Sequence, residues 1–273
     1  MSIVKACVIG SPIKQSKSPL IHNHWIAEHG LKGEYTAVEI LPENLEQDVQ
    51  RLIDSGYAGF NVTAPHKQEI FKLCESVDDT ARKIGAVNTV VVRDGKLHGT
   101  NTDAFGFIEN VHRNTFGTDF LHKPAVVLGA GGAARAVVYA LIEAGAKKII
   151  VLNRTKEKAE EIRKDYPLEI FVGDWAGRNA LLDGAGLLVN TTALGMSGKD
   201  PLDIDLSSLP KEAVVSDIVY APLMTDLLKQ AESRGHQIVT GIGMLLHQAR
   251  PAFEKWFGVL PEVSEALEKK VLT

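Results

Sequence analysis

Hydrophobic and polar positions along this chain follow two periods in turn, one typical of strands and one typical of helices. Residues 5–9 form a short apolar run that predicts a buried strand, and residues 19–29 repeat apolar positions at helical spacing. Residues 35–40 then alternate like a strand, residues 45–54 are helical, and residues 59–62 are extended again. Strands alternating with helices predict parallel strands joined by right-handed crossovers.

Local signals mark the ends of two elements in this first series. Ser18-Pro19 is the pair expected at a helix N-cap and first helical position. Residues 89–93 and 96–98 flank Asp94-Gly95, which is the pattern of a hairpin with a tight turn. The series therefore closes with an antiparallel pair.

A second series of strands and helices follows an amphipathic helix predicted at residues 104–114. Its strands are expected at residues 124–128, 148–152, 168–172, 187–190, 213–217 and 237–240. Helices are expected from 244 to 257 and from about 262 onward. We predict two α/β domains: residues 1–103, completed by C-terminal helices in 241–273, form a mainly parallel α/β domain, and residues 104–240 form a Rossmann-type domain.

Composition narrows the class of protein. The chain has 273 residues, 45% of them apolar and 23% charged, with a net charge of −4, so we expect a soluble globular protein without a nucleic-acid partner. It shows neither a signal-peptide core nor an apolar run of membrane-spanning length, which predicts a cytoplasmic protein with no membrane partner. Cys7 in a strand and Cys74 in a helix are expected to stay unpaired. His22 and His24 would point to different faces of a helix, so no metal site is predicted.

A glycine-rich segment predicts a nucleotide site. Gly129-Ala130-Gly131-Gly132-Ala133-Ala134 follows a predicted strand directly and opens a helix, in the G-x-G-x-x-[GA] pattern. Such glycines allow a tight turn and a close approach of backbone N–H groups to a pyrophosphate at a helix N-terminus. The alternative is a glycine turn that serves only strand-to-helix packing, but the surrounding strand and helix favour a dinucleotide.

The next strand indicates which dinucleotide is bound. It ends at Asn153-Arg154-Thr155, where NAD-specific sites carry an acidic residue and this chain has none. Arg154, with the Thr155 hydroxyl and Lys158 one turn later, suits a 2′-phosphate and favours NADP over NAD. The alternative for Arg154 is a solvated residue at a strand end. Asn190-Thr191-Thr192 ends another predicted strand where parallel sheets bind ligands, although turn chemistry would also explain it.

Two residues ahead of this site are candidates for proton transfer. Lys67 follows the segment Phe60 to His66, and Asp103 ends Asn101-Thr102-Asp103. Oxidation of an alcohol by hydride transfer requires a general base within hydrogen-bond reach of the hydroxyl, so a lysine paired with a carboxylate suggests reversible oxidation of a polyol. Taken alone, Lys67 would be interpreted as an ordinary exposed lysine at a helix start.

Collinear short motifs change that interpretation, because together they resemble the shikimate dehydrogenase family. The match runs in order from residue 9 to about residue 263. The motifs are Gly10-Ser11-Pro12-Ile13, Ser16-Lys17-Ser18-Pro19, His22-Asn23, Phe60-Asn61-Val62-Thr63 with Pro65 and Lys67, Gly85-Ala86-Val87-Asn88-Thr89, Asn101-Thr102-Asp103, Gly129 to Ala134, Asn153-Arg154-Thr155, Asp217-Ile218-Val219-Tyr220 with Pro222, and Gly241 to Gln248.

The resemblance implies the substrate and the residues that bind it. The reaction would be reversible NADPH-dependent reduction of 3-dehydroshikimate to shikimate, on the path to aromatic amino acids, at a cleft between the two domains. Lys67 would exchange the proton, with Asp103 holding it in place. The substrate-binding residues implied are Ser16, Ser18, Asn61, Thr63, Lys67, Asn88, Asp103, Tyr220 and Gln248. Plainer readings are helix capping for Ser18, a turn residue for Asn88 and a solvated helix face for Gln248.

The resemblance also implies the contacts to NADP. They are Asp79, Gly129, Ala130, Gly131, Gly132, Ala133, Asn153, Arg154, Thr155, Lys158, Thr191, Ile218, Gly241 and Met244. For Ile218 and Met244 the alternative is packing, and for Asp79 it is surface solvation. The whole chain could instead be a quinate or shikimate dehydrogenase with relaxed preferences, or a non-catalytic nucleotide-binding regulator. The expected partner is a small molecule, and a homodimer is left open as the assembly.

Overall fold

The computed structural model describes residues 3–116 and 120–272. The polypeptide divides into two compact units: unit 1 comprises Met1–Asp103 and Leu245–Thr273, and unit 2 comprises Ala104–Met244. The second boundary falls after Met244 rather than after the predicted position 240. Within the described residues, no helix combines the length and the apolar character needed to cross a bilayer.

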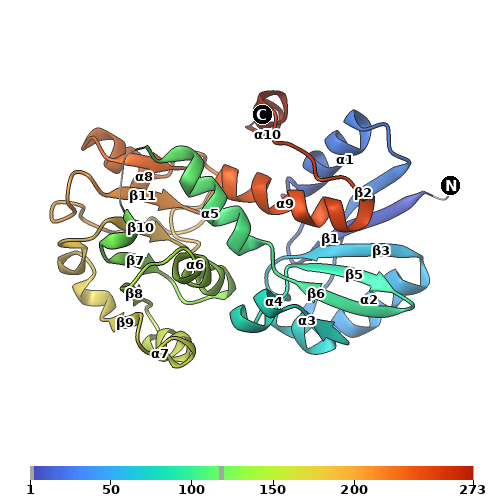
Figure 1. Cartoon of the computed structure of the whole chain (residues 1–273), viewed down its shortest axis with the longest axis horizontal. Helices are drawn as coiled ribbons and strands as arrows, with labels where there is room; N and C mark the ends of the chain where they lie inside the picture. Colours follow the sequence, from blue (N-terminus) through green and yellow to red (C-terminus); the bar gives the residue numbers. More distant parts are fainter. Residues whose placement is uncertain (1–2, 117–119, 273) are drawn as a thin grey trace. The chain divides into compact units, whose positions relative to one another are not determined.

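Unit 1 is built on a mixed six-stranded sheet (Figure 1). Its strands are β1 (Val4–Gly10), β2 (Gly33–Glu39), β3 (Tyr57–Val62), β4 (Ser76–Val77), β5 (Thr89–Arg93) and β6 (Lys96–Thr100), in the spatial order β2-β1-β3-β5-β6-β4. β1 pairs in parallel with β2 and β3, whereas β5 runs antiparallel to both β3 and β6. The β5 to β6 turn has positive φ at Asp94 (50°) and Gly95 (74°), so the predicted tight hairpin is confirmed.

Most helices of unit 1 bury apolar positions against this sheet. The helices of this unit are α1 (Ser18–Glu28), α2 (Leu45–Asp54), α3 (Lys67–Leu73) and α4 (Asp79–Ile84), with α10 (Glu265–Leu272) at the C-terminal end. One core cluster includes Val49 and Leu52 of α2 and Phe60 of β3. The long helix α9 (Gly241–Phe257) joins this unit through its second half, where the Trp256 indole donates to the Val90 carbonyl at 2.9 Å.

Unit 2 carries a six-stranded, fully parallel sheet. Its strands are β7 (Ala125–Leu128), β8 (Ile149–Leu152), β9 (Ile170–Gly173), β10 (Leu187–Asn190), β11 (Val214–Asp217) and β12 (Gln237–Val239), and its helices are α5 (Asp103–Asn114), α6 (Gly132–Glu143), α7 (Lys156–Asp165) and α8 (Asp226–Ser233). The spatial order is β12-β11-β10-β7-β8-β9. Successive strands are added on one side of β7 up to β9, and on its other side from β10 onward, so the strand order switches between β7 and β10. This is the doubly wound Rossmann order, in which ligands bind outside the carboxyl ends of the strands at the switch.

Several local predictions need correction. Helix α1 begins at Ser18 with Lys17 in the N-cap position and without a side-chain cap bond, so Ser18 does not cap it. Cys74 lies just past the end of α3 rather than inside a helix. The last helix starts at Glu265, because residues 259–264 are irregular. The two-residue strand β4 was not predicted, since a pair of residues is too short to show a period.

Candidate functional site

Lys67 and Asp103 meet in unit 1. Each is the first residue of a helix, Lys67 of α3 and Asp103 of α5. The Lys67 Nζ lies 2.5 Å from Asp103 Oδ2, and the two side chains are 20% and 9% exposed. The Val87 N–H donates to the Lys67 carbonyl at 2.9 Å, which ties the start of α3 to the segment before β5. The pair is therefore shielded but still open to solvent.

Asn88 is the centre of a buried hydrogen-bond network beside this pair. Its Nδ2 donates to Asp103 Oδ1 at 2.8 Å and to Thr102 Oγ1 at 3.0 Å, and it lies 3.3 Å from Gln248 Oε1. Its Oδ1 accepts from the Thr102 N–H at 2.8 Å and from the Thr89 hydroxyl at 2.9 Å. Asn88 is 2% exposed. Because each of its groups has a partner, the network fixes the Asp103 carboxylate that faces Lys67.

Asn61 is held from three sides on the neighbouring strand β3. The Tyr35 hydroxyl donates to Asn61 Oδ1 at 2.6 Å, and Asn61 Nδ2 donates to Thr89 Oγ1 at 3.0 Å and to the Asn88 carbonyl at 3.2 Å. Burial raises the pKa of Tyr35 well above its ordinary value, so its hydroxyl keeps the proton it donates. Tyr35 was missed from the sequence, where it appears only as an alternating strand residue.

The other predicted substrate residues of unit 1 lie on two loops. The Ser18 N–H donates to Ser16 Oγ at 3.3 Å at the start of α1. Thr63 follows β3 directly, and its N–H donates to the Ile9 carbonyl at 2.9 Å. Tyr220 lies in unit 2, in the loop after β11.

The glycine turn of unit 2 has the conformation its pattern predicts. Gly129 has φ +111°, and a Cβ there would lie 2.6 Å from Thr191 Oγ1. Gly131 precedes α6, and apart from its own chain neighbours no atom of the described residues lies within 4 Å of the place where a Cβ would stand. Gly129 is thus required by backbone conformation and packing, whereas Gly131 leaves open space in front of the N-terminus of α6. A phosphate group fits such a space.

A pocket of about 220 Å³ opens at this turn. It is lined by Gly129, Ala130, Gly131, Asn153, Arg154, Trp175, Thr191, Thr192 and Leu194. Six of these belong to the predicted cofactor set, and Thr192 belongs to the Asn190-Thr191-Thr192 segment noted at a predicted strand end. Trp175 and Leu194 were not predicted. The only sequence signal for Trp175 was an aromatic residue just beyond a predicted strand end.

The remaining predicted cofactor residues do not line this pocket. Thr155 and Lys158 lie at the start of α7, where the Thr155 carbonyl accepts from Asn153 Nδ2 at 2.7 Å. A Cβ on Gly241 would lie 2.4 Å from the Ile218 carbonyl oxygen, so this glycine allows a close backbone approach. Gly132 and Ala133 open α6, and Met244 lies in α9. Asp79 belongs to unit 1, is 91% exposed and faces Arg82 at 3.5 Å.

A buried carboxylate organises the loops beyond β10 and β11. Asp217 is fully buried and accepts from Asn190 Nδ2 at 3.0 Å, from the Val219 N–H at 3.0 Å and from the Thr225 hydroxyl at 2.7 Å. Burial raises the pKa of Asp217 to about 6, against the opposing effect of these three donors. Asn190 Oδ1 in turn accepts from the Thr192 N–H at 3.0 Å, so the two loops are connected.

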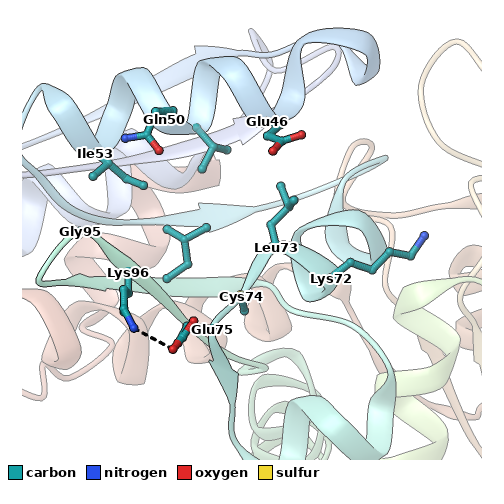
Figure 2. Close-up of a pocket in the computed structure, with 11 residues that line it drawn as sticks. Glu46, Gln50, Ile53, Lys72, Leu73, Cys74, Glu75, Gly95 and Lys96 are labelled. Atoms are coloured by element: carbon teal, nitrogen blue, oxygen red, sulfur yellow. Dashed lines mark hydrogen bonds and ion pairs between the residues drawn. The ribbon is translucent and has the colours of Figure 1, made fainter.

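Unit 1 has a pocket of its own, away from the predicted site residues (Figure 2). It measures about 410 Å³ between α2, the end of α3 and the β5 to β6 turn, and Lys96 and Glu75 form a 2.8 Å ion pair at its edge. Cys74 lies on its lining, and burial raises the pKa of this thiol to about 11, so it is protonated near neutral pH. The lining includes none of the predicted site residues.

A doubly wound sheet with a glycine turn and an arginine after the next strand defines unit 2 as a dinucleotide-binding unit. With a lysine and carboxylate pair in unit 1, the chain has the parts of a pyridine-nucleotide-dependent dehydrogenase.

Family models match the chain in three segments. They are a shikimate dehydrogenase substrate binding domain at residues 8–90, shikimate / quinate 5-dehydrogenase at 111–193 and a shikimate 5′-dehydrogenase C-terminal domain at 241–268.

Whole-chain relatives extend this match. A protein of Paramagnetospirillum magneticum named shikimate dehydrogenase (NADP(+)) is 50% identical over 269 residues, which is 98% of each chain. A shikimate 5-dehydrogenase of Thermus thermophilus, solved with NADP(H) and shikimate, superposes with a TM-score of 0.88 at 34% identity over 98% of both chains. A quinate dehydrogenase of Corynebacterium glutamicum, solved with NAD, superposes with a TM-score of 0.87 at 30% identity. The match covers 98% of this chain and 97% of that one. The chain belongs to the shikimate dehydrogenase family.

Proposed function

We propose that Lys67 and Asp103 carry the proton transfer in the reversible NADPH-dependent reduction of 3-dehydroshikimate to shikimate. The family and the names of its members support the reaction, which belongs to the biosynthesis of aromatic amino acids. The observation that carries the assignment of residues is the 2.5 Å contact between Lys67 Nζ and Asp103 Oδ2. An ammonium held by a carboxylate at a partly exposed position is suited to exchange a proton with a substrate oxygen.

The protein's part in the reaction is to deliver one proton. When bound, NADPH supplies the hydride to the carbonyl carbon. Lys67 donates a proton to the carbonyl oxygen as that oxygen becomes a hydroxyl, and in the reverse direction it removes the proton from the hydroxyl. Asp103 holds the lysine in position, and Asn88 orients the Asp103 carboxylate through the 2.8 Å bond to Oδ1. Lys67 regains its proton from solvent, to which its side chain is 20% exposed.

The substrate's hydroxyls and carboxylate would be bound by neutral polar groups. Ser16 and Ser18 are assigned to the carboxylate, and Asn61, Thr63, Asn88 and Gln248 to the hydroxyls. Tyr220 completes the proposed set of substrate-binding residues. Because both Asn61 N–H groups already donate within the protein, this residue offers its remaining acceptor capacity to a substrate hydroxyl. Each unmatched hydroxyl in such a site would cost about 1–3 kcal/mol, which favours a substrate with a matching pattern.

The cofactor is NADP, in keeping with the names of the relatives. The open space at Gly131 and the N-terminus of α6 would receive the pyrophosphate. Arg154 would bind the 2′-phosphate, helped by Asn153, Thr155 and Lys158. The chain's own chemistry fits this group, because a guanidinium offers several donors to a phosphate and no acidic residue stands at 153–155 to repel it.

Steady-state rates with shikimate and quinate, each with NADP⁺ and with NAD⁺, test the proposal. We expect the highest kcat/KM for shikimate with NADP⁺. The nearest alternative is a quinate or shikimate dehydrogenase with relaxed preferences, since quinate differs from shikimate only by hydration of a ring bond. Equal or better turnover of quinate with NAD⁺ would favour that alternative. Absence of turnover together with nucleotide binding would favour a regulatory protein.

Two finer points complete the proposal. We propose that the protein is cytoplasmic and that it assembles as a homodimer. Cell fractionation tests the location, and sedimentation equilibrium tests the assembly. A mass near the 29.6 kDa of one chain would contradict the dimer.

A further inference from the structure

Four segments reach the carboxyl edge of the unit 2 sheet in register. Asn190, Leu128, Leu152 and Gly173 are the last residues of β10, β7, β8 and β9, and neighbouring members of this series pair with one another. Two residues beyond them lie Thr192, Ala130, Arg154 and Trp175, and all four line the 220 Å³ pocket. The pocket therefore extends across the edge in this order, with Trp175 just past the end of the outermost strand, β9.

This order indicates which part of a dinucleotide would lie beside each residue. The glycine turn after β7 is the place for the pyrophosphate, and Arg154 after β8 is the residue assigned to the 2′-phosphate. The adenine is attached to the ribose that carries this phosphate. Continuing outward along the edge from Arg154, the next residue is Trp175. We propose that the Trp175 indole is the stacking surface for the adenine base of NADP.

The indole is fixed in place by contacts that leave it available to the pocket. Asp174 accepts from the Ala176 N–H at 3.0 Å, which caps the short turn Trp175–Gly177. The Arg178 guanidinium carbon lies 5.5 Å from the centroid of the indole ring, within cation–π range. Arg178 itself is held by an ion pair to Asp203 at 2.7 Å and by its donation to the Trp175 carbonyl at 3.2 Å.

An aromatic ring at this position fits the chemistry of adenine better than the alternatives in the pocket lining. Purine bases stack on aromatic side chains through their π faces. Trp175 also packs on the core cluster of unit 2 through its partly buried side chain, so little conformational freedom is lost when a base binds. The inference rests on the NADP dependence and on the placement of the 2′-phosphate at Arg154.

Binding of two adenosine probes to the full-length protein tests the inference without relying on activity. Adenosine 2′,5′-bisphosphate and 5′-AMP share the base but differ in the 2′-phosphate. We expect Trp175→Ala and Trp175→Leu to weaken both probes by the same factor, about tenfold, when measured by titration calorimetry. Trp175→Phe retains an aromatic ring and should stay within about threefold of the unchanged protein.

Phe171, on the strand that precedes Trp175, provides a matched control. It is an exposed aromatic residue of β9 with the Lys148 ammonium 5.4 Å from its ring centroid, and it does not line the pocket. Phe171→Ala should leave both affinities unchanged. Arg154→Ala should weaken the bisphosphate and leave 5′-AMP nearly unchanged, which separates the base from the phosphate.

Three results would overturn the role of Trp175. They are affinities of Trp175→Ala and Trp175→Leu within twofold of the unchanged protein, a loss confined to the bisphosphate, and an equal loss in Phe171→Ala. If the unchanged protein bound the bisphosphate no better than 5′-AMP, the placement of the 2′-phosphate would fail instead. The ratio measured with 5′-AMP would still decide the role of Trp175.

Discussion

At the scale of single residues, the proposed chemistry depends on the unusual place of a lysine. Lys67 is the first residue of α3, where the positive end of the helix dipole disfavours an ammonium group. The 2.5 Å contact with Asp103 offsets this cost, and the Asn88 network keeps that carboxylate from turning away. The helix dipole makes an ammonium group unfavourable at this position, and the contacts with Asp103 nevertheless hold it there. Such a lysine suits a role in proton transfer.

Replacing Lys67 tests that role. Lys67→Ala should lower kcat by about 10²–10⁴ while the KM for shikimate changes little, because a general acid–base group acts on the transition state. The matched control is Lys72→Ala on the same helix, whose ammonium is exposed and paired with Glu69 at 2.8 Å. Initial-rate kinetics at saturating NADP⁺ provide the measurement. A large rise in KM with kcat intact would make Lys67 a substrate-binding residue instead.

At the scale of elements, the strand, turn and helix formed by β7, the glycine turn and α6 combine two different demands on glycine. Gly129 is needed for the protein's own structure, because its φ of +111° and the nearby Thr191 exclude a side chain. Gly131 has neither constraint, and its missing side chain leaves space in the pocket lining. The same motif therefore contains one structural glycine and one that serves the ligand.

Two alanine substitutions separate these demands. Gly129→Ala should lower the free energy of unfolding by about 1–3 kcal/mol, because the added methyl meets Thr191 in a strained backbone conformation. Gly131→Ala should leave this free energy unchanged or slightly higher, since alanine restricts the unfolded chain. It should nevertheless weaken NADP⁺ at least about tenfold by occupying the phosphate space. Urea unfolding and titration calorimetry on each variant check both results, and unimpaired NADP⁺ binding by Gly131→Ala would contradict this placement.

At the scale of the whole molecule, the C-terminal part of the chain completes the core of unit 1. Phe253 and Trp256 of α9 lie beside His22 of α1, with ring centroids 5.8 and 5.7 Å away, and Tyr35 stacks on the same imidazole at 4.0 Å. His22 is fully buried, and among the residues that the structure describes neither of its ring nitrogens meets a partner in hydrogen-bond geometry. Burial lowers its pKa from the ordinary 6.5 to about 3. This core therefore contains a histidine that must stay neutral.

The buried histidine predicts loss of stability in acid. Between pH 6.5 and about 3 the unfolded chain binds a proton on His22 that the folded chain does not. The contribution of His22 to the free energy of unfolding should therefore be complete above pH 6.5 and fall by about 1.4 kcal/mol per pH unit below it. Asp217 acts in the opposite direction, because its raised pKa makes the folded protein bind a proton more tightly up to about pH 6.

Comparing variants isolates the contribution of His22. His22→Phe keeps an aromatic ring in the cluster and should reduce the slope of unfolding free energy against pH between 4.5 and 6.5. His29→Gln, at an exposed position, should leave the slope as it is. Urea unfolding at several pH values gives both slopes. If the His22→Phe protein showed the same slope of unfolding free energy against pH as the unchanged chain, the prediction would be wrong.

Local sequence patterns determined most elements and the turn chemistry of this protein. The Asp94-Gly95 hairpin, the glycine turn and nearly all strands follow from residues close together in the chain, because turn geometry and side-chain periodicity are local properties. Only the tertiary structure decided which residues meet across long separations. The contact of Tyr35 with Asn61, the Asn88 network and the position of Trp175 beside Arg154 depend on strand order and register. Packing of the whole sheet sets that register, and no short segment encodes it.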